Sequence, residues 1–132
     1  MMIRLAPSSL CLVTALFAAS LGGCYDVASW EVTQLTDAPF DPVVTDTAIE
    51  LTEGTAIAVR LALLDADRYL ILPKDAKWSV EGSAAVLRTS AAEGVYLLGA
   101  SSPGQATLVG KGDAGGEARI AVTVLPQPSP LP

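Results

Sequence analysis

The chain contains no histidine and only two cysteines among its 132 residues. Without histidine, a Ser-His-Asp or Cys-His catalytic system and a histidine metal site are excluded. Aromatic residues make up only 5% of the sequence, and 8 basic residues stand against 14 acidic ones. The net charge of −6, with no basic cluster, argues against binding to nucleic acid.

The sequence also lacks the motifs of several enzyme classes. Its serines are not set in a nucleophile elbow, and no glycine-rich phosphate-binding pattern precedes a helix. Gly110-Lys111-Gly112-Asp113 lies between two predicted strands and is better explained as part of a hairpin. General acid-base chemistry would depend on carboxylates alone. We therefore expect a protein that is not an enzyme and that needs no cofactor or metal.

Asp65 and Asp67 form the best pair of carboxylates, with Asp75 further along the chain. Oxygen-rich loops of this kind can hold calcium. Aspartates also make turns and keep loops soluble. We expect the turn role here, and a calcium site is the alternative.

The beginning of the chain has the three parts of a secretory signal. Arg4 supplies a positive end, residues 10–21 form an apolar stretch, and small residues close the segment. The apolar stretch is too short to span a bilayer on its own. An uncleaved anchor from Ile3 to Gly23 is the alternative, but Pro7-Ser8-Ser9 interrupts it.

Leu21-Gly22-Gly23-Cys24 closes this segment and resembles the lipobox of bacterial lipoproteins. The resemblance implies that residues 1–23 are a cleaved signal peptide, with Leu21, Gly22 and Gly23 recognised by the signal peptidase. A thiol accepts a diacylglyceryl group as a thioether, so Cys24 would become the lipidated first residue of the mature protein. Two acyl chains hold a protein stably on a membrane, at about 0.8 kcal/mol per buried methylene. The membrane is therefore an expected partner, reached through these acyl chains.

Cleavage would also remove Cys11, which leaves Cys24 as the only cysteine and excludes a disulfide in the mature chain. Tyr25 occupies the position where aspartate marks retention in the inner membrane of enteric bacteria. We therefore expect the protein in the cell envelope, at the outer membrane.

Residues 24–42 are polar and small, and we expect them to be mainly a tether. The short alternation Trp30-Glu31-Val32-Thr33-Gln34-Leu35 could add an edge strand. Trp30 would then pack on the domain or rest at the membrane interface rather than bind a ligand. Residues 126–132 are rich in proline and are expected to form an extended or disordered tail.

In residues 43–125, apolar residues recur with period two, in runs separated by glycine, proline and aspartate. This pattern indicates an all-β sandwich of about seven strands. The predicted strands cover Ile49–Leu51, Ile57–Leu64, Trp78–Glu81, Val86–Thr89, Val95–Ala100, Ala106–Gly110 and Ile120–Val124. Tyr69–Leu72 is either a short edge strand or a loop that packs down. Trp78 is expected to be buried between the sheets, surrounded by the apolar residues Ile57, Val59, Leu61, Val80, Leu108, Ile120 and Val122.

The order of these strands, with Trp78, Pro103-Gly104-x-Ala106-x-Leu108 and Ile120-x-Val122-x-Val124, resembles the bacterial Ig-like domains of group 2. Domains of that kind look like adhesion and spacer units. The resemblance therefore implies an Ig-like module for binding, adhesion or structure that contacts a protein or a glycan, although fold alone does not establish function. The alternative is an accessory subunit or inhibitor of a periplasmic enzyme or secretion complex.

Overall fold

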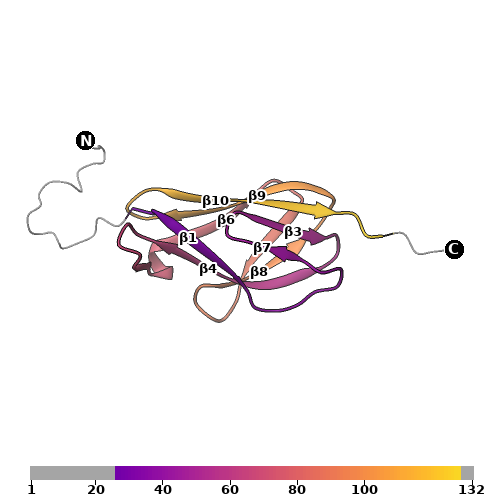
Figure 1. Ribbon diagram of the computed structural model, residues 1–132, viewed down its shortest axis with the longest axis horizontal. Coiled ribbons are helices and arrows are strands. Elements are labelled where there is room, and N and C mark those ends of the chain that lie inside the picture. Colours follow the sequence, from indigo (N-terminus) through magenta and orange to yellow (C-terminus); the bar gives the residue numbers. More distant parts are fainter. Residues whose placement is uncertain (1–25, 129–132) are drawn as a thin grey trace, which may run out of the picture.

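The computed structural model describes residues 26–128, which form two β-sheets packed face to face (Figure 1). The first sheet contains, in spatial order, β1 (Ser29–Gln34), β4 (Ala56–Leu64), β8 (Val95–Ala100) and β7 (Ala85–Thr89), and β5 (Leu70–Ile71) pairs with the end of β4. The second contains β2 (Val43–Val44), β3 (Ala48–Thr52), β10 (Glu117–Leu125), β9 (Gly104–Gly112) and β6 (Ala76–Glu81). A 3-10 turn, Pro73–Asp75, joins β5 to β6. The predicted all-β sandwich is confirmed, with ten strands in the described residues where about seven were expected.

Neighbouring strands pair antiparallel, except that β3 runs parallel to β10. Ala48 lies opposite Ala121 and Thr52 lies opposite Leu125 in that parallel pair. The chain crosses from the first sheet to the second between β1 and β2. β1 and β2 therefore form an edge of each sheet, and β3 lies between β2 and the last strand, β10.

The core lies between the sheets because each long strand turns alternate side chains inward. On β4 the inward residues are Ile57, Val59, Leu61 and Leu63, all at most 4% exposed. Leu108, Ile120 and Val122 meet them from β9 and β10 and are completely buried. Val80 is only partly buried. The predicted core is confirmed for these three strands.

Trp78 packs against the core between the sheets as expected, but it is only half-buried rather than buried. Its strand, β6, is the last in the order of the second sheet. An edge strand has a neighbour on one side only, and one flank of the ring therefore remains open to solvent. The ring packs on β9, where Gly110 lies directly opposite Trp78.

Residues 29–34, which we expected to belong mainly to a tether, instead form the edge strand that their alternation allowed. β1 pairs with β4 from Ser29 opposite Leu64 to Gln34 opposite Val59. Trp30 packs against the core, and its indole Nε1–H donates a hydrogen bond of 2.7 Å to the carbonyl of Asp46. The Asp46 carboxylate accepts a hydrogen bond of 2.9 Å from the amide of Val32. These long-range bonds hold β1 on the domain.

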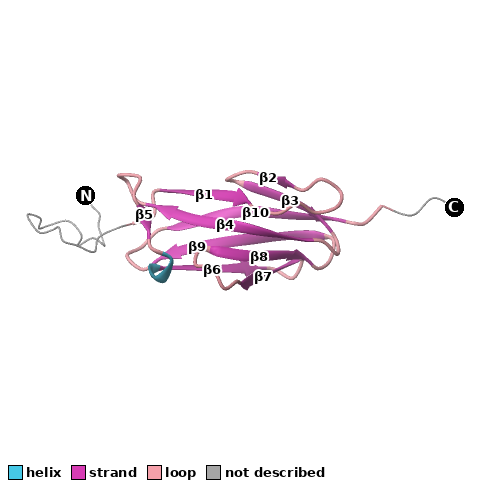
Figure 2. Cartoon of the chain, turned by 90° about the horizontal axis from the view of Figure 1, so that it is seen from below, coloured by secondary structure: helices cyan, strands magenta, loops and turns pink. Residues whose placement is uncertain are grey.

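Past β10, residues 126–128 pair with no strand, and residues 129–132 of the predicted tail lie outside the described part. The side chain of Gln127 donates a hydrogen bond of 3.1 Å to the carbonyl of Glu53. Figure 2 shows β5 and the 3-10 turn at one end of the molecule, while the chain leaves β10 at the other. Between residues 26 and 128, no helix has the length and hydropathy needed to cross a membrane.

Candidate functional site

The predicted lipidation residue Cys24 and its recognition residues Leu21, Gly22 and Gly23 lie outside the described residues 26–128. Only Tyr25 separates Cys24 from Asp26, where the description begins. The surface on which the following residues lie is therefore the part of the domain nearest to the predicted anchor. We call it the β5 end, and it consists of residues 65–75 and the hairpin loop 113–116.

The start of the described chain is bound to the β5 end by its backbone. The amide of Val27 donates a hydrogen bond of 3.1 Å to the carbonyl of Gly115, and the amide of Ala28 donates one of 2.8 Å to that of Leu64. Gly116 lies so close that a Cβ there would come within 2.9 Å of the Val27 nitrogen. A glycine is therefore required for this approach. Strand β1 is thus tied to the hairpin immediately after the predicted anchor.

A small second core reinforces this attachment. Its buried members are Leu63, Ile71 and Ala118. The partly buried residues Val27, Trp30, Ala76 and Trp78 pack against it. Val27 packs on this cluster and lies three residues after Cys24 in the sequence. Residues 27–34 of the expected tether 24–42 are therefore part of the packed domain.

The loop between β4 and β5 is shaped by the buried carboxylate of Asp65, a residue only 6% exposed. Its Oδ1 accepts hydrogen bonds from the amides of Asp67, at 2.9 Å, and Tyr69, at 3.0 Å. Arg68, between them, has a φ of 67°. The turn role predicted for Asp65 is confirmed, because this oxygen already satisfies two backbone donors.

Apolar side chains project from the β5 end. Ile71 is buried at 7% exposure, whereas its neighbours Leu70 and Leu72 are 52% and 51% exposed, and Tyr69 is 69% exposed. Strand alternation explains this pattern, since Ile71 turns into the second core and its two neighbours must turn outward. A shallow pocket of about 530 Å³ lies between β5 and the hairpin residues Asp113 and Ala114. Tyr69-Leu70-Ile71-Leu72 is an apolar run in the sequence, but its exposure at the surface was not predicted.

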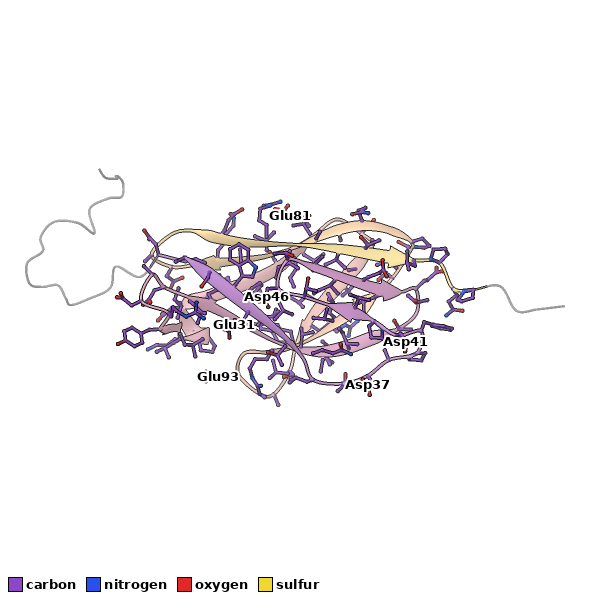
Figure 3. All side chains as sticks on the ribbon, viewed as in Figure 1. Glu31, Asp37, Asp41, Asp46, Glu81 and Glu93 are labelled. Carbon is purple, nitrogen blue, oxygen red and sulfur yellow. The ribbon has the colours of Figure 1, made fainter. Side chains whose placement is uncertain are left out.

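Carboxylates are spread over the molecule, and Figure 3 shows Glu81 at the opposite edge from Asp37 and Glu93. Within the described part of the chain, no three His, Cys, Asp or Glu side chains are grouped to hold a metal ion. Among the described residues, ion pairs join Arg119 to Glu81 at 2.7 Å and to Glu117 at 2.9 Å. The hydrogen bonds that Arg119 donates to the carboxylates of Glu117 and then Glu81 raise the pKa of Arg119 above its ordinary value. These three residues bridge the outer faces of β10 and β6.

The outer face of the first sheet carries a second apolar group. Val86 on β7 is 42% exposed and Leu97 on β8 is 44% exposed. With Ala56 and Gly99 they line a shallow pocket of about 320 Å³.

No protein-family model and no curated protein matches this chain. Among solved structures, it is similar to the crystal structure of domains 4 and 5 of the S-layer protein SbsC, with 14% sequence identity and a TM-score of 0.50. The match covers 71% of this chain and 53% of that one, so the chain spans about half the length of that structure. At this identity the likeness shows the shared β-sandwich fold alone.

Proposed function

We propose that this protein is a lipid-anchored protein of the bacterial cell envelope and that its Ig-like domain is a structural or adhesion module rather than an enzyme. The observation that carries the proposal is the order Leu21-Gly22-Gly23-Cys24 directly before a folded domain. A lipidated cysteine at this position would attach the domain to a membrane without any helix of its own. The membrane is the first partner, and a protein or glycan would be the second.

The shape of the domain supports a structural or adhesion role. The chain enters at the β5 end, where Val27 is bound to Gly115, and leaves after β10 at the other end (Figure 1). β10 contains nine residues, which correspond to about 30 Å along the strand. A domain of this form would hold whatever it binds at a set distance from the membrane. Its likeness to an S-layer protein is in keeping with a place at the cell surface.

The lipid anchor is tested by Cys24→Ser in the full-length protein. We expect the variant to stay in the aqueous phase in detergent partitioning and to lose the mass of the acyl chains, since serine cannot form the thioether. Cys11→Ser is the matched control, because the proposed cleavage removes Cys11, and it should partition like the parent. Equal partitioning of Cys24→Ser and the parent would refute the anchor.

We further propose that the lipidated protein is sorted to the outer membrane, because Tyr25 follows Cys24. Separation of the two membranes by density would locate the parent. Tyr25→Asp should move the protein to the inner membrane in an enteric host, whereas Tyr25→Phe should leave it in place. A parent found with the inner membrane would contradict this sorting.

A second candidate function is favoured by the outer face of the first sheet. An accessory subunit or inhibitor needs an apolar surface for one dedicated protein, and Val86 and Leu97 supply exposed apolar groups there. A photoreactive residue placed at Leu97 in cells would form one discrete adduct in that case. The same residue placed at Ser79 on the other sheet is the control. Absence of a discrete adduct at Leu97 would leave the structural role.

A further inference from the structure

We propose that the β5 end is itself a membrane contact, in which Tyr69, Leu70 and Leu72 lie in the headgroup region of the bilayer that holds the Cys24 acyl chains. This inference rests on the proposed lipidation of Cys24. It adds a second, non-covalent attachment, which would set how the domain stands on the membrane.

The distance along the chain places the β5 end close to the bilayer. From Cys24 to Val27 the backbone reaches at most about 11 Å when fully extended. Val27 is hydrogen-bonded to Gly115 at 3.1 Å and packs with Ile71 in the second core. A flexible tether over residues 24–42 would instead have an average reach of about 25 Å. The short connection therefore keeps these loops near the headgroups.

The side chains that would meet the lipid are held outward by the fold. Ile71 is buried, so Leu70 and Leu72 on either side of it must point away from the second core. Leu70 lies opposite Leu64 in the sheet, and it remains 52% exposed. Tyr69 is the most exposed of the three, at 69%. Tyrosine is enriched at membrane interfaces, where its ring and hydroxyl meet apolar and polar surroundings together.

Charge at the β5 end determines the kind of contact. The carboxylates of Asp67 and Asp113 are exposed and that of Asp75 is partly buried. Together they outnumber the basic groups of Arg68 and Lys74 on the same loops. Attraction to anionic lipid is therefore absent, and the contact must come from apolar insertion. Because the acyl chains already hold the protein at the surface, a weak insertion is enough to orient the domain.

Single introduced cysteines can report this contact in the full-length, lipidated protein. Leu72→Cys is labelled with an environment-sensitive dye and reconstituted in vesicles of phosphatidylethanolamine and phosphatidylglycerol. We expect a blue shift of the dye emission and quenching by brominated acyl chains. Leu125→Cys is the matched control, since Leu125 is also exposed, at 40%, but ends β10 at the far end of the domain. Neither effect should occur there.

Measurements on the parent protein test the lipidation of Cys24 separately from the membrane contact of the β5 end. A lipidated Cys24 cannot take up the thiol dye, so the parent should float with the vesicles and remain unlabelled. A parent that is labelled, or that does not float, would refute the anchor and the contact together. A floating, unlabelled parent with equal dye signals at Leu72→Cys and Leu125→Cys would refute the contact alone.

Two further outcomes distinguish lipid from other surroundings. Changing Tyr69 and Leu70 to serine in the labelled Leu72→Cys protein should reduce the quenching while flotation is unchanged. Unchanged quenching would mean that these side chains make no contact. A dye protected from aqueous iodide but not quenched by brominated lipid would show a protein covering the β5 end, which would also overturn the inference.

Discussion

The indole ring of Trp78 lies against the backbone of Gly110, so that a Cβ at Gly110 would come within 2.7 Å of two ring carbons. The two residues are direct cross-strand partners on β6 and β9. Any side chain at position 110 must therefore displace the ring.

We accordingly expect Gly110→Ala to lower the free energy of unfolding by about 1–3 kcal/mol, which is typical of overpacking. Gly99→Ala is the matched control, because a Cβ at Gly99 meets its nearest atoms at 3.9 and 4.0 Å. Chemical denaturation of both variants measures the difference. Similar stabilities would show that the ring moves aside without cost.

Trp78→Ala should cost about 3 kcal/mol, near the lower limit for truncation of a large aromatic residue, because the side chain is only half-buried. In this background the penalty of Gly110→Ala should disappear, since the clashing ring is absent. A double-mutant cycle tests both statements. Strict additivity, or a melting temperature of Trp78→Ala within a few degrees of the parent, would contradict this packing.

Calcium should not stabilise the domain. A bound ion in hundredfold excess over its Kd would add about 2.7 kcal/mol, which a thermal melt with calcium and with chelator would detect. Asp65→Ala should cost about 1–3 kcal/mol with or without calcium, because the amides of Asp67 and Tyr69 lose their acceptor. Asp67→Ala serves as the control. A calcium shift that disappears in Asp65→Asn/Asp67→Asn would establish a metal site instead.

Stability should fall at alkaline pH through Tyr96. Burial raises the pKa of its phenol above the ordinary value of 10.0. As the pH rises, the unfolded chain therefore loses the phenol proton before the folded chain does. The contribution of Tyr96 to the free energy of unfolding is complete below about pH 10 and is lost as the pH rises through the higher pKa of the folded protein. Tyr96→Phe should flatten this alkaline decline in denaturation series, and Tyr69→Phe, on the exposed β5 end, should not. Equal slopes for all three proteins would refute the effect.

Asp46 should control the attachment of β1. Asp46→Ala removes the acceptor of the Val32 amide and should cost about 1 kcal/mol. Hydrogen exchange should accelerate across Ser29–Gln34, while the amides of β9 and β10 keep their protection. Asp37→Ala is the control on the neighbouring loop. Unchanged exchange in β1 would mean that its pairing with β4 alone is sufficient.

Sequence alternation predicted the long strands because β4, β9 and β10 each have one face in the core. It could not decide the state of residues 29–34, where only Trp30 and Val32 turn inward and the partners are residues 59–64 of β4. Their pairing depends on contacts with residues far away in the sequence, and a local sequence pattern carries no information about such contacts.

The same limit applies to depth and exposure. Periodicity assigned Trp78 to the inner face correctly, but its burial depends on the position of β6 at a sheet edge. For Tyr69–Leu72, alternation predicts that Ile71 and its neighbours face opposite sides of the strand. It does not show whether another part of the protein covers those neighbours. The prediction of lipidation at Cys24 depends on a local chemical signal, whereas the β5 end is assembled from residues 65–75 and the hairpin 113–116, which lie far apart in the sequence.

The opposite placement of entry and exit has a mechanical consequence. A pull on the chain beyond β10, against a fixed Cys24, acts along the strands rather than across them. The load on β10 is then carried by its five residue pairs with β3 and its eight with β9, and the load on β1 by its six pairs with β4. Sliding must break each ladder at once instead of opening it pair by pair. We expect the domain to resist tension because its strand ladders are loaded in shear, with a single high rupture force in pulling experiments.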